Sequence, residues 1–166
     1  MDKKLFVFIN KMAGKSELLD KLMIYASNEM RYIYPIAFIF ILIYQPKRTR
    51  RNFLFTSAFI MLLNYCVIFL VKKIKYRPRP FITRQANVLL SSKLDSSYLS
   101  KHTLFAFSIS TLIYMINKVL GKYLFILSMF MGLSRVWVGV HYPLDAVRGG
   151  ILGSLCSLVM KLIFIK

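Results

Sequence analysis

The sequence of 166 residues predicts an all-α protein, a polytopic transmembrane bundle of about five spanning helices preceded by N-terminal interfacial helices. Three observations predict this fold. Hydrophobic residues make up 57% of the chain, uncharged stretches recur along it, and short basic segments separate several of them. A net charge of +18 is typical of nucleic-acid-binding domains, but such domains are polar. Because this chain is strongly apolar, we expect no nucleic-acid partner.

The spanning helices are predicted from stretches without charged residues. Only residues 53–71 form a stretch longer than the ~18 residues that a spanning helix needs. The others reach that length if flanking lysines and arginines extend to the lipid headgroups. Each stretch alone would also fit a buried helix of a soluble protein, but their number favours a membrane bundle. The five stretches are 32–46, 53–71, 103–117, 123–134 and 149–160.

The orientation follows from two short basic connections, 46–52 and 117–122. Both lie on the same side if the helices alternate in direction, and the positive-inside rule places that side in the cytoplasm. The long basic segment 72–101 then lies on the extracytoplasmic face, although its charge alone would favour the cytoplasm. We therefore expect a multi-pass cell-membrane protein with its site outside the cytoplasm.

The first 30 residues are expected to form a separate interfacial, amphipathic segment. They carry too many charges to span a membrane and too many large apolar residues to stay in water. Residues 31–166 are then the transmembrane domain that carries the chemistry.

A first candidate motif follows the 53–71 helix and reads K-K-I-K-Y-R-P-R-P at 72–80. Two X-Pro steps end the helix and favour an extended chain, which holds the arginines in fixed directions. Arginines held in this way suit phosphate oxygens. The alternative is a basic loop that anchors the helix to headgroups.

Two further motifs carry the only histidines of the chain. Ser100 is a candidate N-cap, and His102 in the following turn would face an anion bound at the helix N-terminus. His141 and Asp145 follow Arg135, and a carboxylate beside an imidazole fixes its tautomer and raises its basicity. The alternatives are an ordinary N-cap and a structural His–Asp contact. Within the second of these motifs, Trp137 and Tyr142 are expected to be membrane-interface anchors rather than ligand stackers.

The combination is more specific than its parts. Helix alternation brings both histidines to one membrane face, where an orienting carboxylate and fixed cations surround them. Such a set suits phosphoryl transfer without a metal, because the carboxylates that would hold Mg²⁺ are missing. We therefore expect no metal ion and no other cofactor. The cations of this set are Lys72, Arg79 and Arg135.

The motif order K-x6-R-P, S-x-H and S-R-x5-H-x3-D resembles the type 2 phosphatidic acid phosphatase family, which is related in its site to vanadium haloperoxidases. The resemblance covers roughly residues 53–160. The third motif is complete, whereas the middle one, usually P-S-G-H, has Leu99 and Lys101 in place of proline and glycine. The motif residues are Lys72, Arg79, Pro80, Ser100, His102, Ser134, Arg135, His141 and Asp145.

The resemblance implies a role for each motif residue. His141 would attack phosphorus and carry the phosphoryl group, Asp145 would orient it, and His102 would protonate the leaving oxygen and then activate water. The substrate phosphate would be held by Lys72, Arg79, Ser100 and Arg135. Lys101 adds positive charge at the same place, so we include it among the phosphate-binding residues.

The resemblance also implies a lipid phosphate or diphosphate as substrate. Short bacterial members with this organisation resemble undecaprenyl pyrophosphate phosphatases of the bacitracin-resistance type, which serve cell wall biogenesis. A diphosphate also suits the excess of cations. Phosphatidic acid and phosphatidylglycerol phosphate are alternative substrates. A non-catalytic lipid-binding member of the family is a further alternative, supported by the two departures from P-S-G-H.

Overall fold

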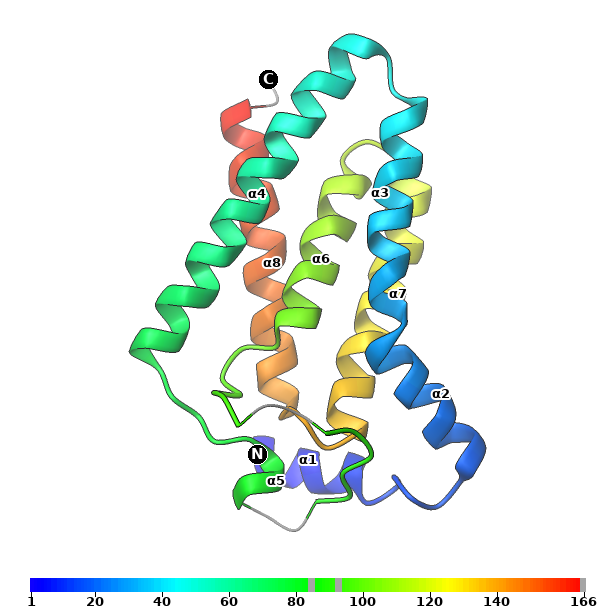
Figure 1. The fold of residues 1–166 in the computed structure, drawn as a ribbon, viewed down its shortest axis with the longest axis vertical. Helices are drawn as coiled ribbons and strands as arrows, with labels where there is room; N and C mark the ends of the chain where they lie inside the picture. The colour runs from blue at the N-terminus through cyan, green and yellow to red at the C-terminus, as the bar shows by residue number, and fades with distance from the viewer. Residues whose placement is uncertain (84–85, 92–93, 165–166) are drawn as a thin grey trace.

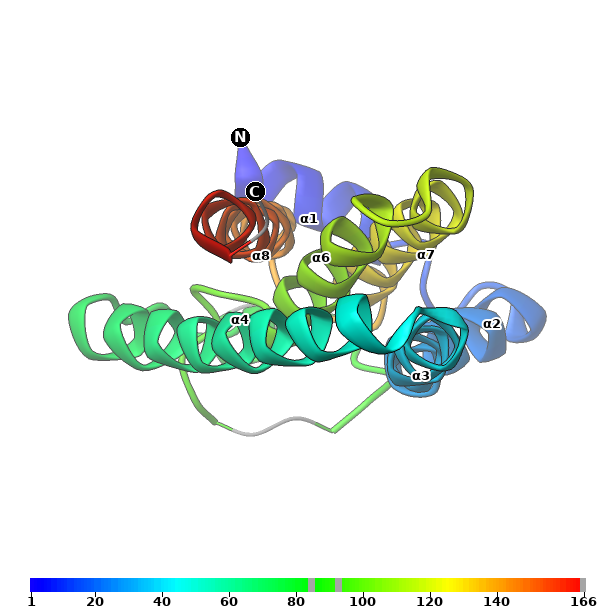
Figure 2. The ribbon, with the colours of Figure 1, turned by 90° about the horizontal axis from the view of Figure 1, so that it is seen from above.

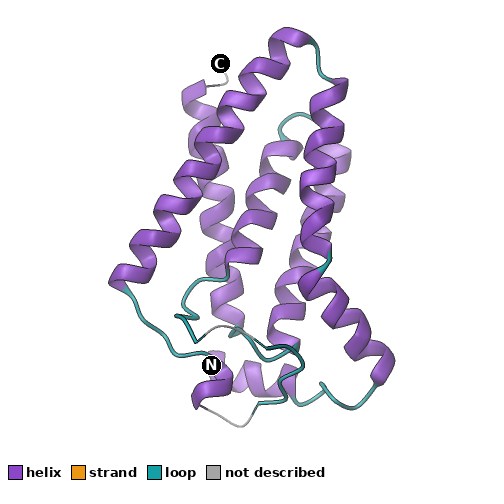
Figure 3. Ribbon diagram, viewed as in Figure 1, coloured by secondary structure: helices purple, strands orange, loops and turns teal. Residues whose placement is uncertain are grey.

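The computed structural model describes residues 1–83, 86–91 and 94–164, and these residues form helices and loops without a strand (Figures 1 and 3). The all-α prediction is confirmed. Arg84, Lys93 and Lys166, which contribute to the charge pattern, lie outside the described residues. The helices are α1 (Asp2–Asn10), α2 (Glu17–Asn28), the 3₁₀ helix η1 (Met30–Tyr32), α3 (Ile33–Tyr44), α4 (Lys47–Ile74), α5 (Pro80–Thr83), α6 (Lys101–Tyr114), α7 (Lys118–Trp137) and α8 (Pro143–Phe164).

The five helices of the bundle, α3, α4, α6, α7 and α8, each overlap one of the five uncharged stretches. Among the described residues, three segments are long and apolar enough to cross a membrane, namely 49–74 in α4, 118–137 in α7 and 143–160 in α8. Helices α3 and α6 are shorter, with 12 and 14 residues. Helix α4 extends beyond 53–71 at both ends because the flanking basic residues continue the helix.

The connections gather at two opposite ends of the bundle (Figure 1). One end carries the α3–α4 and α6–α7 turns together with the C-terminal end of α8. The other carries the N-terminus, α1, α5, the long connection from α4 to α6 and the α7–α8 turn. Figure 2 shows α4 running across the group of α3, α6 and α8. The alternation expected from the sequence therefore brings the three motifs to one end.

Helices α6 and α8 pack closely because glycines of α8 face the backbone of α6. A side chain at Gly153 would collide with the carbonyl oxygen of Leu104. A Cβ at Gly149 would lie only 2.6 Å from the carbonyl oxygen of Ser100. These two positions require glycine, and they fix the N-terminal turn of α6 against the first turns of α8.

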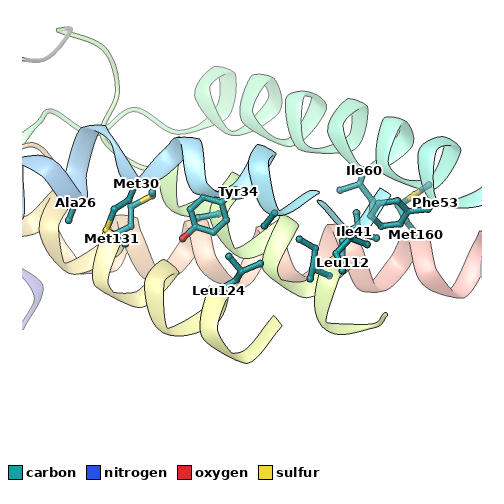
Figure 4. Packing of buried hydrophobic residues seen from close by; sticks show 13 residues of the cluster. Ala26, Met30, Tyr34, Ile41, Phe53, Ile60, Leu112, Leu124, Met131 and Met160 are labelled. Carbon is teal, nitrogen blue, oxygen red and sulfur yellow. The ribbon is translucent and has the colours of Figure 1, made fainter. Parts of the chain in front are cut away.

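The main apolar core fills the space between α3, α4, α6, α7 and α8 (Figure 4). Tyr34 and Met131 lie at its motif end, and Phe53 and Met160 lie at the opposite end. Within this core, buried hydroxyl groups of different helices form hydrogen bonds with each other, as in the 3.0 Å bond between Tyr34 Oη and Ser128 Oγ. The bundle therefore has a packed interior that holds the helix ends at the motif end in place.

The N-terminal helices cover the α7–α8 turn. Phe6 of α1 is fully buried and meets the ring of Tyr142 edge-on at 5.3 Å, and Trp137 Nε1 donates to Asp20 of α2 at 2.8 Å. Trp137 and Tyr142 are only 5% and 2% exposed, so the expectation that they anchor the protein at the membrane interface is wrong. The reason is tertiary, because α1 and α2 fold beneath the turn and enclose both rings.

Candidate functional site

A polar cavity of about 360 Å³ opens at the motif end of the bundle, between the helix ends and the α4–α6 connection. It is lined by residues from all three motifs and by Asp95 of the connecting loop. Five of the eight predicted site residues contribute to its wall: Arg79, Lys101, His102, Arg135 and His141. The structure therefore brings together most of the side chains that the sequence analysis selected.

His141 lies in the turn between α7 and α8 and is 3% exposed. Its Nδ1 lies 3.2 Å from the carbonyl oxygen of Ser97 and 3.2 Å from the hydroxyl of the same residue. A carbonyl oxygen can only accept a hydrogen bond, so Nδ1 carries the proton. Nε2 is then the nitrogen with a free lone pair.

Asp145 lies one helical turn after His141, in the first turn of α8, and is fully buried. Its Oδ2 is 3.9 Å from His141 Nδ1, too far for a direct hydrogen bond. The hydroxyl of Ser97 closes this gap by donating to the same oxygen at 2.7 Å. The expected contact between carboxylate and imidazole is thus mediated by a serine of the loop.

Other donors fix Asp145. It accepts from the backbone N–H of Tyr142 at 2.9 Å, from Arg77 at 2.5 Å and from Arg148 at 3.1 Å. Arg77 also binds Asp2 at 2.6 Å, which joins α1 to the start of α8. The carboxylate therefore belongs to a network that closes the end of the bundle.

Asp95 forms ion pairs with cations of the first and middle motifs. Its Oδ1 accepts from Arg79 Nη2 at 2.6 Å, and its Oδ2 lies 2.7 Å from Lys72 Nζ and 3.7 Å from Lys101 Nζ. Arg79 also donates to the carbonyl oxygen of Val140 at 3.0 Å, directly before His141. Three of the predicted phosphate-binding cations thus converge on one carboxylate.

Arg135 is 6% exposed and reaches the cavity from the last turn of α7. Its Nη1 donates to Ser27 Oγ at 2.7 Å. Its buried Nε has no hydrogen-bond partner among the described residues. A buried donor without a partner raises the free energy of the folded protein. The Nε–H group of Arg135 is therefore available to donate a hydrogen bond to an anionic ligand.

Ser100 occupies the predicted N-cap position of α6. Its hydroxyl is paired with Thr103 Oγ1 at 2.9 Å, and the residue is fully buried. Its backbone N–H donates to the carbonyl oxygen of Asp145 at 3.1 Å. Ser100 therefore fixes the start of α6 against α8, and its neighbours Lys101 and His102 are the residues of this turn that line the cavity.

The electrostatics of the cavity favour a neutral imidazole and an ionised carboxylate. Burial lowers the pKa of His141 well below its usual value, and the charges of Arg135 and Arg79 lower this pKa further. Burial alone would raise the pKa of Asp95, but hydrogen bonds from Lys72 and Arg79 outweigh it and hold that pKa below its usual range. His141 can therefore act as a neutral nucleophile close to fixed positive charge.

Sequence reasoning missed two residues that organise this site. Ser97 is one of several serines in the loop, and no motif or periodicity distinguishes it. Arg77 lies inside the first motif, two residues before Arg79, where the sequence distinguishes it only as one basic residue among several. Pairing with Asp145 becomes evident only when the loop and α8 are placed together.

Comparison with known proteins identifies the family to which most of the chain is similar. The family described as the PAP2 superfamily matches residues 53–166. "Bacitracin transport permease protein BcrC" of Bacillus licheniformis is 30% identical over 156 residues, covering 92% of this chain and 75% of that protein. "Undecaprenyl-diphosphatase BcrC" of Bacillus subtilis is 27% identical over 170 residues, covering 100% and 83%. Among solved structures, LpxE of Aquifex aeolicus matches with a TM-score of 0.80 and 25% identity, over 96% of this chain and 93% of that one.

Proposed function

The chain belongs to the PAP2 superfamily, and from this premise we propose that it is a membrane lipid phosphatase that removes the terminal phosphate of a polyprenyl diphosphate, undecaprenyl diphosphate in particular. The reaction would pass through a phosphohistidine at His141, need no metal ion, and take place on the extracytoplasmic face. The cell-wall carrier lipid would then be the physiological substrate.

One arrangement carries the proposal: a neutral imidazole that is tied by Nδ1 to Ser97 and lies in a cavity lined with arginines. Because Nδ1 holds the proton, Nε2 of His141 can attack the terminal phosphorus. The N–P bond forms as the bond to the bridging oxygen breaks. The imidazolium that results is stabilised by Asp145 through the Ser97 hydroxyl.

His102 is assigned the proton transfers. It lies in the first turn of α6 and lines the same cavity as His141. Burial and the charge of Arg135 lower the pKa of His102 to about 4, and the negative charge of a bound phosphate would oppose this shift. As an imidazolium it would donate a proton to the leaving oxygen, and as a neutral base it would then take a proton from water. That water breaks the N–P bond, releases phosphate and restores both histidines.

Arg79, Arg135 and Lys101 are assigned to the oxygens of the terminal phosphate, since all three line the cavity. Fixed cations stabilise the charge that spreads over these oxygens during transfer. Lys72 acts beside them through Asp95. Ser100 contributes through the position of the helix start, because its hydroxyl is bonded to Thr103.

The names of the two relatives point to different activities, a transport permease and a diphosphatase. The site favours the hydrolase, since two histidines, a linked carboxylate and several cations are what phosphoryl transfer requires. Phosphatidic acid, phosphatidylglycerol phosphate and non-catalytic lipid binding remain outcomes of the test.

The test measures phosphate release by the purified protein in detergent with a metal chelator present. Undecaprenyl diphosphate, phosphatidic acid and phosphatidylglycerol phosphate are compared at equal mole fraction. We expect the highest kcat/KM with the diphosphate and no release by His141→Ala. A higher kcat/KM with either glycerolipid would replace the diphosphate as the proposed substrate. Absence of phosphate release from all three lipids would refute the proposed phosphatase activity.

A further inference from the structure

A second, apolar cavity of about 260 Å³ meets the polar one at the motif end of the bundle. Its wall comes from α3, α6 and α7, with Tyr34, Ala106 and Ile109 among the residues that line it. The two cavities share three residues: Arg31, Lys101 and His102. A ligand with its polar group in one cavity and its apolar part in the other would therefore lie against these three side chains.

Arg31 differs from the other cations at this junction. It lies in η1, before residues 53–166 that match the family, and its side chain is exposed. Its hydrogen bond goes to the hydroxyl of the adjacent Tyr32 at 3.1 Å, and its guanidinium lies 4.9 Å from the centre of that ring. In the described part of the chain it forms no ion pair with a carboxylate, whereas Lys101 lies 3.7 Å from Asp95.

Arg31 also lies beside groups assigned to the reaction, because it lines the polar cavity together with His102 and His141. His102, which is assigned to the leaving oxygen, is a wall residue of both cavities, whereas His141 lines the polar one alone. The part of the substrate beyond the breaking bond thus leaves the polar cavity past His102 and Arg31.

The chemistry of that part depends on the substrate. In a lipid monophosphate it is an uncharged carbon chain, and in a lipid diphosphate it is a second, anionic phosphate. An arginine without an acidic partner favours the phosphate, because a guanidinium binds phosphate oxygens in a bidentate manner. The apolar cavity beyond it suits the first carbons of the chain.

We propose that Arg31 binds the inner phosphate of a lipid diphosphate and thereby selects diphosphates over monophosphates, while the apolar cavity between α3 and α6 receives the start of the chain. The inference rests on the proposed phosphatase function and deepens it. Arg31 is here a specificity-determining residue, and His141 and His102 act on either kind of substrate.

The test compares farnesyl diphosphate with farnesyl monophosphate, which share one chain and differ by one phosphate. Initial rates are measured in detergent for the wild type, Arg31→Gln, Arg31→Lys and Lys15→Gln. Lys15 is the matched control, an exposed cation in the turn between α1 and α2 at the same end of the bundle. Loss of a charge-assisted hydrogen bond should lower kcat/KM for the diphosphate about tenfold in Arg31→Gln.

The monophosphate rate serves as the internal control for folding. We expect Arg31→Gln to keep it within about threefold, Arg31→Lys to keep part of the diphosphate preference, and Lys15→Gln to change neither rate. An equal loss with both substrates, or no loss with either, would overturn the role of Arg31. A wild type that hydrolyses the monophosphate but not the diphosphate would overturn it as well and leave the phosphatase intact. A wild type inactive on every lipid phosphate would remove the proposed function itself.

Discussion

Asp95 holds Arg79 in an ion pair, with Oδ1 of the carboxylate 2.6 Å from Nη2 of the guanidinium. The same carboxylate also binds Lys72, so it occupies the cations that a phosphate would use. A phosphate that enters the cavity must therefore compete with a carboxylate of like charge. The low pKa of Asp95 keeps that carboxylate ionised above strongly acidic pH, and its contribution to stability is lost only as the pH falls through this lowered pKa.

Asp95→Asn should consequently strengthen the binding of inorganic phosphate. Removal of a like charge from a partly buried site is expected to lower the inhibition constant for phosphate roughly tenfold. The turnover number should not rise, because the product then leaves more slowly. Product-inhibition kinetics measure both effects, with Glu17→Gln as the control, since Glu17 is an exposed acid of α2. Weaker inhibition by phosphate in Asp95→Asn would contradict competition.

Ser97→Ala tests the link between Asp145 and His141. The backbone carbonyl of Ser97 still fixes the proton on Nδ1, but the hydroxyl that reaches Asp145 is lost. We expect kcat to fall about ten- to a hundredfold, as for other residues that orient a reacting ligand, with a smaller change in KM. Ser57→Ala is the matched control, because the half-buried Ser57 of α4 donates only to the carbonyl oxygen of Leu54 in its own helix. Wild-type kcat in Ser97→Ala would show that the link is not needed.

This variant is a cleaner test than Asp145→Asn. Asp145 also binds Arg77, Arg148 and the backbone of Tyr142, so its substitution disturbs the closure of the bundle as well as the imidazole. Ser97 has only the two groups of the reacting assembly as side-chain partners.

The helices and the grouping of motifs could be predicted because they depend on local pattern and alternation. Uncharged stretches indicated five helices, and the two X-Pro steps indicated that α4 would not continue, in agreement with its end at Ile74. The short helix α5, which begins at Pro80, was not expected. Alternating direction then placed both histidines at one end (Figure 1). Each of these inferences needs only residues that are neighbours in the sequence and the number of helices that span the membrane.

The details of the site could not be predicted because they depend on contacts distant in the sequence. Ser97 reaches Asp145 across 48 residues, and Arg77 reaches Asp2 across 75. Trp137 was assigned to the interface because aromatic rings near helix ends usually lie there, but α2 covers it. Nothing in the local sequence indicates where the N-terminal helices pack.

The tautomer and the pKa of His141 can be observed directly, because the chain has two histidines and His102→Asn leaves one. We expect ¹⁵N chemical shifts of an imidazole protonated on Nδ1, with a titration midpoint below 6.5, the usual value. The unfolded chain binds a proton at higher pH than the folded one, so protein stability should fall as the pH drops below about 6.5. An imidazole protonated on Nε2, or a midpoint at or above 6.5, would contradict the arrangement.

The orientation in the membrane can be tested by cysteine labelling of intact cells. Ser91→Cys reports the motif end and Thr49→Cys the opposite end, after replacement of Cys66 and Cys156. A membrane-impermeant maleimide should label Ser91→Cys in intact cells and Thr49→Cys only after permeabilisation, because the basic α3–α4 turn favours the cytoplasm. Labelling of Thr49→Cys alone in intact cells would place the site on the cytoplasmic face.

The roles of the two histidines are separated by rapid quenching with a labelled lipid diphosphate, kept alkaline because phosphohistidine is acid-labile. His141→Ala should form no phosphoenzyme and have no turnover, since the attacking Nε2 is gone. His102→Ala should lose about 10²–10⁴-fold in turnover but still form some phosphoenzyme when the leaving group is good, because only proton transfer is impaired. Phosphoenzyme in His141→Ala would move the nucleophile to His102. Its absence from the wild type during turnover would favour direct attack by water, and the tie between Ser97 and His141 Nδ1 would then orient a base instead of a nucleophile.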